Sequence, residues 1–328
     1  MKYREFGKTG WQISEVGLGC WQLGGADWGD VSDERAFDVL AAALDTGVNF
    51  LDTADVYGLG RSESLIGAFL RERSESVYVA TKLGRFPEPG WPENFSYNTI
   101  KAHVEASLKR LGREQIDLIQ LHCIPSEVLR EGEVFDSLRR IKAAGLVREF
   151  GVSVETMEEG ALCLVQEGLV SLQIIFNLFR QKPIEKLFED AAAKRIGLIA
   201  RLPLASGLLS GKFTRETQFE ASDHRHYNRD GAQFNVGETF AGIEFKTAVG
   251  LVEKVRERVS SEQGLADTAL RWCLDHPAIS TIIPGAKQTA QVQQNCAVSD
   301  LPPLSASIHR SLESLYHSEV SGVIRGPY

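Results

Sequence analysis

Eight short apolar segments recur along the 328 residues, with amphipathic stretches between them. They read VGLG (16–19), NFLD (49–52), VYVATK (77–82), DLIQLH (117–122), REFGVS (148–153), LQIIFN (172–177), GLIAR (197–201) and STIIPG (280–285). Apolar, β-branched segments of this length that alternate with helices are typical of parallel strands buried on both faces. We therefore predict an α/β fold, and eight such units favour a closed (β/α)8 TIM barrel over an open sheet.

The stretches between these segments carry apolar residues at the three- and four-residue spacing of an amphipathic helix. Residues 97–112 place Ile100, Val104, Leu108 and Leu111 on one face and end on glycine, a common helix stop. The same pattern recurs at residues 33–47, 133–145, 156–168 and 184–197. No G-x-G-x-x-G sequence follows a predicted strand, which argues against a Rossmann dinucleotide-binding domain.

Two further segments modify this plan. The first fourteen residues place REF and QIS on either side of GKTGW, which predicts an N-terminal β-hairpin. Residues 212–245, after the seventh strand, are polar and aromatic-rich and lack periodicity. A loop of that length in a compact domain is usually a lid or a binding loop. Because no linker or low-complexity segment interrupts the chain, we predict a single domain over residues 1–328.

Charge and cysteine usage exclude several kinds of partner and site. The chain has 36 Lys and Arg against 44 Asp and Glu, a net charge of −8, which disfavours nucleic acid and anionic membranes. No signal peptide or membrane-spanning run is visible. The five cysteines are scattered and lack a C-x-x-C pair, so we expect free thiols in a cytoplasmic protein. His224 and His226 have no third ligand nearby in sequence, so no metal site is predicted.

Ionisable side chains stand where three predicted strands end. Asp52 ends the second strand, Lys82 the third and His122 the fourth, while Tyr57 follows in the loop after Asp52. Taken singly, Asp52 could be a turn residue, Tyr57 a rim residue and His122 a core histidine. A lysine on a strand buried on both faces, however, needs a carboxylate neighbour. Asp52 lies at the matching level of the adjacent strand, so we expect the four side chains to meet at the active face of the barrel.

These four residues suit the reduction of a carbonyl group. The Lys82 ammonium stabilises a phenolate, so we expect it to lower the pKa of Tyr57 and make the phenol a usable acid. Asp52 keeps Lys82 charged, and His122 can orient the carbonyl oxygen. The hydride must come from a cofactor, because no side chain supplies one. A Schiff-base aldolase with Lys82 as the nucleophile is a second possibility, although a paired, charged lysine is a poor nucleophile.

Several motifs resemble the signature segments of the aldo-keto reductase superfamily: DTADVYGLGRSESLIG, ATKLG and IDLIQLH. The similarity extends in order through FGKTGWQISEVGLGCWQLGG, LVREFGVS, LPLASGLLSGKF and IPGAKQTAQVQQN, over nearly the whole chain. It points to the long bacterial branch that includes inositol-catabolism-type and general-stress reductases and that also resembles potassium channel β subunits. The resemblance implies the barrel, a nicotinamide cofactor bound without a Rossmann domain, and Tyr57 as the general acid of a tetrad with Asp52, Lys82 and His122.

The resemblance also implies cofactor contacts. Ser153 and Gln173 would bind the carboxamide, and Lys212 the pyrophosphate. The full set expected to contact the cofactor is Trp21, Asp52, Ser153, Gln173, Arg201, Pro203, Leu204, Ala205, Ser206, Gly207, Lys212, Gly285, Lys287, Gln291, Gln294 and Asn295. Two positions depart from the family pattern: Gln291 replaces an arginine common in NADP-preferring members, and Arg201 with Leu202 replaces an aromatic–Ser pair. We expect NADP(H), held through Lys287 with Arg225 as a second contact, and NAD(H) is the alternative.

Substrate contacts are expected in the loops, at Trp21, Tyr57, Phe86, Trp91 and His122. His224, Arg225 and Arg229 are interpreted as polar contacts to substrate or cofactor phosphate. The leading hypothesis is NADP(H)-dependent reduction of a small aldehyde, ketone or aldose. The alternatives are an NAD-dependent sugar dehydrogenase on the same site and a redox-sensing binding subunit without turnover.

Overall fold

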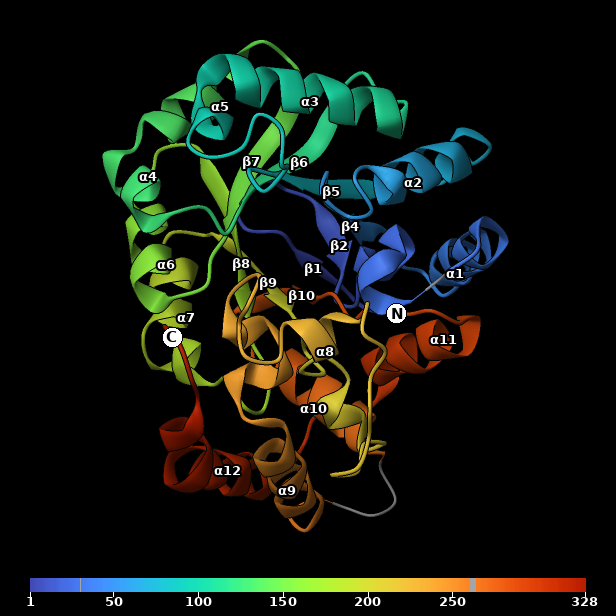
Figure 1. The fold of residues 1–328 in the computed structure, drawn as a ribbon, viewed down its shortest axis with the longest axis vertical. Coiled ribbons are helices and arrows are strands. Elements are labelled where there is room, and N and C mark those ends of the chain that lie inside the picture. The colour runs from blue at the N-terminus through green and yellow to red at the C-terminus, as the bar shows by residue number, and fades with distance from the viewer. Residues whose placement is uncertain (30, 260–263) are drawn as a thin grey trace.

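The computed structural model describes residues 1–29, 31–259 and 264–328. Its eight parallel strands pair in chain order, so each lies beside the next (Figure 1). They are β3 (Leu18–Gly19), β4 (Phe50–Asp52), β5 (Tyr78–Leu83), β6 (Ile116–His122), β7 (Val147–Ser153), β8 (Leu169–Ile175), β9 (Gly197–Arg201) and β10 (Ile279–Ile282). Each predicted strand overlaps one of these, so the strand prediction is confirmed.

The sheet closes on itself where β10 meets the segment around β3. Parallel bridges join Val16 to Ile282 and Gly19 to Gly285. The backbone N–H of Gly17 donates to the carbonyl of Ile282 at 2.8 Å. A side chain on Gly17 would lie 2.9 Å from the carbonyl oxygen of Phe50, so glycine permits this close approach. The predicted (β/α)8 barrel is confirmed.

Helices between the strands surround the barrel (Figure 1). Their ends carry the capping devices expected from the sequence: in α3, Ser96 accepts from the N–H of Thr99, and Gly112 is left-handed. The helices are α1 (Asp33–Asp45), α2 (Arg61–Arg71), α3 (Tyr97–Leu111), α4 (Ser126–Glu131), α5 (Glu133–Ala143), α6 (Met157–Leu164), α7 (Leu187–Ala193), α8 (His224–Tyr227), α9 (Phe245–Arg256), α10 (Leu265–Leu274), α11 (Thr289–Ala297) and α12 (Ala306–Leu315). None among the described residues is long and apolar enough to cross a bilayer.

The predicted N-terminal hairpin is also present. Its strands β1 (Tyr3–Glu5) and β2 (Gln12–Ser14) pair in antiparallel fashion. Phe6 and Trp11, in the connection between them, are buried and stack on each other, and Phe6 also contacts Phe50 at the start of β4. The hairpin therefore covers the end of the barrel where the strands begin and leaves the opposite end free for a site.

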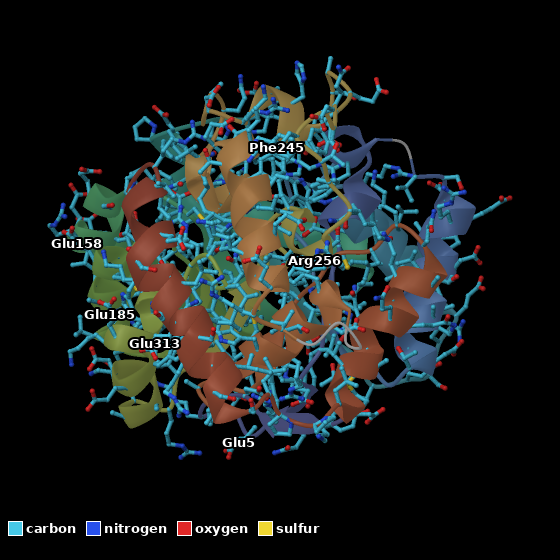
Figure 2. The ribbon with its side chains drawn as sticks, turned by 90° about the horizontal axis from the view of Figure 1, so that it is seen from below. Glu5, Glu158, Glu185, Phe245, Arg256 and Glu313 are labelled. Carbon is cyan, nitrogen blue, oxygen red and sulfur yellow. The ribbon has the colours of Figure 1, made fainter. Side chains whose placement is uncertain are left out.

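The segment after β9 has more regular structure than the predicted loop. It contains α8 and two 3-10 turns, Val236–Glu238 and Phe240–Gly242, and it leads into α9. Figure 2 shows α9 between its labelled ends, beside the helix α12. An ion pair joins Lys254 of α9 to Glu319, in the turn that follows α12. We call residues 212–245 the insertion.

All five cysteines are unpaired and buried, as the prediction of free thiols requires. The pKa of each thiol is raised, chiefly by burial; in Cys123 it reaches about 11. None is therefore a thiolate at neutral pH.

Candidate active site

Three predicted site residues meet where β4 and β5 end. The ammonium Nζ of Lys82 donates to Asp52 Oδ2 at 2.5 Å and to the carbonyl of Thr53 at 2.9 Å. The same Nζ lies 3.4 Å from the hydroxyl oxygen of Tyr57. The fourth residue, His122 at the end of β6, places its ring 5.8 Å from the Tyr57 ring, nearly perpendicular to it. The structure thus brings the predicted four together.

Burial and charge act in opposite directions on this cluster. Burial is the largest single effect and favours the neutral amine of Lys82, but Asp52 and Tyr57 together outweigh it and raise the pKa of Lys82. Burial also raises the pKa of Tyr57 to about 12, because it outweighs the opposing effect of Lys82. Lys82 lowers this pKa, as predicted, but burial raises it by more, so the phenol carries its proton at neutral pH.

His122 is held neutral. Burial lowers its pKa well below the usual value, and the positive charges of Arg85, Lys82 and Arg201 add to that effect. The buried Nδ1 of His122 has no hydrogen-bond partner among the described residues. A neutral imidazole with a free polar atom is available to a ligand as a donor or an acceptor.

Asp52 has amide partners that the sequence reasoning did not pair with it. Its Oδ1 accepts from Gln173 Nε2 at 2.7 Å and from Gln120 Nε2 at 3.1 Å. Gln173 was expected to bind the carboxamide of the cofactor, and here it also fixes Asp52. Gln120 could have been found from the sequence, because it is an amide inside the apolar segment DLIQLH. A buried amide side chain needs a hydrogen-bond partner.

Asp55, in the loop between β4 and Tyr57, is buried. Both carboxylate oxygens lack a hydrogen bond among the described residues, and Oδ2 lies 3.9 Å from His103 Nδ1. Burial raises the pKa of Asp55 to about 8, and the nearby charge of Glu63 adds to the rise. Asp55 is therefore protonated at neutral pH and does not act as a second carboxylate for Lys82.

A cavity of about 1070 Å³ opens over the strand ends. A cavity of this size can hold a dinucleotide together with a small substrate. The predicted residues that line it are Trp21, Asp52, Tyr57, Trp91, His122, Gln173, Arg201, Pro203, Leu204, Ser206, Gly207, Lys212, Gly285, Lys287 and Gln291.

Other predicted site residues lie outside this lining. Lys82 stands behind Tyr57, and the lining also lacks Ser153, Ala205, Gln294 and Asn295.

Two of the predicted residues outside the lining have partners elsewhere. The side chain of Gln294 donates to Asp267 at 3.1 Å. The ring of Phe86 packs edge-on against His103 instead of facing the cavity. Phe86 therefore does not line the cavity, and its contact with substrate stays a prediction.

The turn after β9 is strained. Leu202, Ala205 and Ser206 adopt positive φ angles of 54°, 47° and 59°, although none is glycine. Such strain of order 1–3 kcal/mol per residue concentrates at ligand sites. Ser206 is held by a hydrogen bond from its hydroxyl to the carbonyl of Glu238 at 2.9 Å. The resemblance implied that residues 203–207 of this turn contact the cofactor, and Pro203, Leu204, Ser206 and Gly207 line the cavity.

The cations that line the same cavity include Lys212, Arg225 and Lys287. Burial lowers the pKa of Lys287, and the charge of Arg225 lowers it further. Gln291 accepts from the backbone N–H of Lys287 at 2.7 Å, which fixes the start of this segment. Together with the unpartnered His122 Nδ1, these cations fit a phosphate-bearing dinucleotide, because they place positive charge where an anionic chain would lie.

The insertion is tied across the mouth of the cavity. Asp27 accepts from Trp21 Nε1 at 3.0 Å and from the Tyr227 hydroxyl at 2.6 Å. The buried ring of His224 packs against Trp21 and Trp28. His224 is thus a packing residue rather than a phosphate contact.

Two arginines of the insertion behave differently from each other. Arg225 pairs with Asp223 and lines the cavity. Arg229, expected to contact substrate or phosphate, lies outside the lining.

The sequence reasoning missed a charged group on the cavity wall. Arg85, Glu155 and Glu238 all line the cavity and are linked by ion pairs, and Arg201 joins them. Nothing in the local sequence pairs residues that lie 70 and 153 positions apart along the chain.

Comparison with known proteins agrees with this geometry. The sequence profile of the Aldo/keto reductase family matches residues 15–317. The chain belongs to the aldo/keto reductase family. It is 28% identical to the aldo-keto reductase YhdN of Bacillus subtilis, over 100% of this chain and 97% of that protein.

Two solved structures also resemble this reductase. The holo form of an aldo-keto reductase from Bacillus halodurans has a TM-score of 0.79 and 27% identity, with 96% of each chain covered. A glycerol dehydrogenase from Gluconobacter oxydans has a TM-score of 0.77 and 26% identity, covering 99% of this chain and 98% of that one. The chain is thus an oxidoreductase whose family uses nicotinamide cofactors on small-molecule carbonyl compounds.

Proposed function

We propose that this protein reduces aldehyde or sugar carbonyls to alcohols with NADP(H), and that Tyr57 is the general acid. The observation that carries the proposal is the Asp52–Lys82–Tyr57 chain of contacts, which faces the same cavity as neutral His122. The similar protein from Gluconobacter oxydans is named a glycerol dehydrogenase, and glycerol is a polyol. That name supports a hydroxylated carbonyl compound as the substrate here.

In this mechanism, the carbonyl oxygen of the substrate lies between the Tyr57 hydroxyl and the His122 ring, and accepts a hydrogen bond from each. When bound, the reduced nicotinamide supplies a hydride to the carbonyl carbon. As negative charge develops on the oxygen, the phenol proton of Tyr57 moves to it, which forms the alcohol. The ammonium of Lys82 stabilises the phenolate left behind, and water then returns a proton to Tyr57.

The NADP(H) preference rests on the cations of the cavity. A 2′-phosphate needs positive charge, and Lys287 and Arg225 both line the cavity, where burial and the charge of Arg225 lower the pKa of Lys287. Gln291 brings no charge, and its side-chain oxygen already accepts a backbone N–H. Stronger binding of NADH than of NADPH would instead support the sugar dehydrogenase alternative.

Replacing Tyr57 by Phe tests the assignment. The variant lacks the proton donor, so turnover of an aldehyde panel should fall about 10²- to 10⁴-fold. NADPH binding should stay within about twofold, because the ring is preserved. Binding is measured from protein fluorescence, which should respond through Trp21 on the cavity wall.

Tyr3→Phe is the matched control for this test, since Tyr3 is an exposed tyrosine of the hairpin. Unchanged turnover in Tyr57→Phe would refute the assignment. NADPH binding by the wild type without turnover of any aldehyde would favour the redox-sensing subunit.

The aldolase alternative places the nucleophile on Lys82. That side chain is 1% exposed and bonded to both Asp52 and Thr53, and its raised pKa keeps the amine protonated. A protonated amine has no lone pair for attack on a carbonyl. Borohydride should therefore trap no substrate on the protein, and covalent trapping at Lys82 would favour the aldolase.

A further inference from the structure

Four side chains form what we call the charged wall: Arg85, Glu155, Arg201 and Glu238. A guanidinium nitrogen of Arg85 lies 2.8 Å from Glu155 and 3.1 Å from Glu238. Arg201 lies 3.3 Å from the other oxygen of Glu238. All four side chains line the cavity that holds Tyr57 and His122. The proposed chemistry uses none of them.

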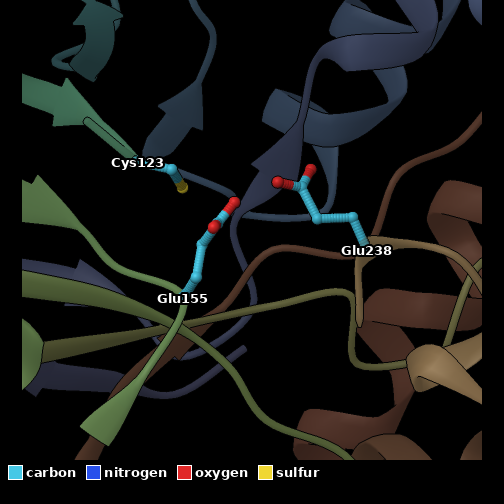
Figure 3. A group of neighbouring side chains, drawn as sticks. All are labelled: Cys123, Glu155 and Glu238. Atoms are coloured by element: carbon cyan, nitrogen blue, oxygen red, sulfur yellow. The ribbon is translucent and has the colours of Figure 1, made fainter. Parts of the chain in front are cut away.

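The charged wall is assembled from distant parts of the chain. Arg85 follows β5, Glu155 follows β7, Arg201 ends β9 and Glu238 belongs to the insertion. Figure 3 shows Glu155 and Glu238 converging from two such segments toward Cys123.

The charged wall borders the reacting groups directly. Cys123 follows His122 in the chain, and its sulfur lies 3.4 Å from a guanidinium nitrogen of Arg201. The positive charges of Arg85 and Arg201 also contribute to the low pKa of His122. The wall therefore faces whatever is attached to a carbonyl group held by His122.

A metal ion is one conceivable ligand of this region, because Cys123, Glu155 and Glu238 place ligand atoms within 4.8 Å of one another. Both carboxylates, however, already bind guanidinium groups. Burial raises the pKa of the Cys123 thiol to about 11, so the sulfur keeps its proton. A cation would meet two fixed positive charges and a protonated thiol, so the charges oppose metal binding.

Stability alone gives no reason for the wall. Buried ion pairs are often no more stabilising than apolar residues of the same volume, because desolvation offsets their attraction. Arg201 is only 8% exposed, yet its Nε has no hydrogen-bond partner among the described residues. Arg85 and Glu155 keep about a fifth of their side-chain surface open, at 20% and 19%. The wall therefore presents an unpaired donor at Arg201, and its carboxylates keep further lone pairs that can accept, although Glu155 Oε2 already accepts from Asn235 Nδ2 at 3.0 Å.

The alternation of donors and acceptors selects among ligand chemistries. A carboxylate on the substrate would meet Glu155 and Glu238, and an ammonium group would meet Arg85 and Arg201. An apolar chain would displace water from these ions without replacing its hydrogen bonds, which is costly. A hydroxyl group both donates and accepts, so it can bond to either kind of side chain.

We propose that the charged wall determines substrate specificity by binding hydroxyl groups on the carbons beside the reacting carbonyl. The substrates are then neutral hydroxyaldehydes or aldoses rather than apolar or anionic aldehydes. This inference rests on the proposed reductase function. Arg85 and Glu155 are the more accessible members, so they are the direct hydroxyl contacts.

The test compares glyceraldehyde, which carries two hydroxyl groups, with propanal and with succinic semialdehyde. Wild type should prefer glyceraldehyde by kcat/KM. Glu155→Gln keeps the shape but loses the carboxylate. At pH 8, above the pKa of about 7 to which burial raises Glu155, its kcat/KM for glyceraldehyde should fall about tenfold or more. The kcat/KM for propanal should stay within about twofold. If Glu155→Gln folds poorly, Arg85→Lys replaces it in the test. Lysine keeps the charge but not the two-pronged geometry of arginine, so the same selective loss is expected.

Glu149→Gln is the matched control. Glu149 has the same 19% side-chain exposure as Glu155 and an ion pair with Lys142, but it lies outside the cavity lining. It should leave both substrates unaffected. Equal losses for glyceraldehyde and propanal in Glu155→Gln, or no loss for either, would overturn the role of the wall.

A binding measurement separates the wall from the reductase proposal. Tyr57→Phe saturated with NADPH should bind glyceraldehyde more tightly than propanal, and adding Glu155→Gln should remove that difference. If wild type reduces no carbonyl but this binding preference persists, the reductase function fails and the wall stands. Equal binding of the two aldehydes would overturn the wall whatever the turnover.

Discussion

Two acids three residues apart, Asp52 and Asp55, have different chemistry because their neighbours differ. Asp52 accepts from an ammonium and two amides. Asp55 is equally buried, yet no described residue donates to its carboxylate. Its own backbone N–H donates to the carbonyl of Lys82 at 3.1 Å, so it lies directly behind the proposed catalytic group. The two acids are close in the sequence DTAD, but the structure gives them different partners.

Asp55→Asn should remove a pH dependence of stability. The pKa of Asp55 is about 8 in the folded protein and about 3.9 in an unfolded chain. Between these values the folded state holds the extra proton, so wild-type stability falls as pH rises. Asparagine cannot ionise, so the stability of the variant relative to wild type should improve by up to about 1 kcal/mol per pH unit between pH 5 and 8. Urea unfolding at three pH values measures this, and a constant difference would contradict it.

At the scale of elements, the hairpin and the barrel depend on each other. Phe6 is fully buried, and a side chain on Gly197 at the start of β9 would lie 2.7 Å from its ring. The hairpin thus packs directly against the backbone of β9, and this contact is possible because residue 197 has no side chain. Because this contact lies at the end of the barrel away from the cavity, it concerns stability and not chemistry.

Phe6→Ala should therefore lower the free energy of unfolding by about 3–5 kcal/mol, as for other buried phenylalanines. The kcat of the folded fraction should stay unchanged. Denaturant unfolding and specific activity measure the two effects. Val165→Ala is the control, because Val165 is 71% exposed and its loss should change stability by less than about 0.5 kcal/mol. A marked loss of kcat in Phe6→Ala would mean that the hairpin shapes the site.

At the scale of the whole molecule, local sequence patterns predicted the strands and helices of the barrel but not the residues of the cavity wall. The β5 segment VYVATK carries its own apolar run and a terminal lysine, so both its strand and its need for Asp52 could be read locally. Arg85 and Glu238 look like ordinary surface charges in sequence. Their pairing depends on how the insertion crosses the mouth of the barrel. Helix and strand periodicity within a short segment cannot predict a contact of that kind.

The cavity also predicts how the cofactor stabilises the protein. NADPH at about 100 times its Kd should raise the free energy of unfolding by about 2.7 kcal/mol, since only the folded barrel assembles the site. Lys287→Gln should reduce the NADPH effect and leave the NADH effect unchanged. Thermal unfolding with each nucleotide measures this, with the exposed Lys109→Gln as the control. Equal losses for both nucleotides would place Lys287 away from the 2′-phosphate.

The burial of every thiol has a practical consequence for watching this enzyme work. With Cys20, Cys123, Cys163, Cys273 and Cys296 all buried, maleimide dyes should label the native protein much more slowly than an exposed thiol. A single cysteine introduced at Leu59, which is 63% exposed two residues after Tyr57, should then be labelled first. A fluorophore there would report ligand binding beside Tyr57, and the unmodified protein, in which Cys20 and Cys123 line the cavity, is the labelling control.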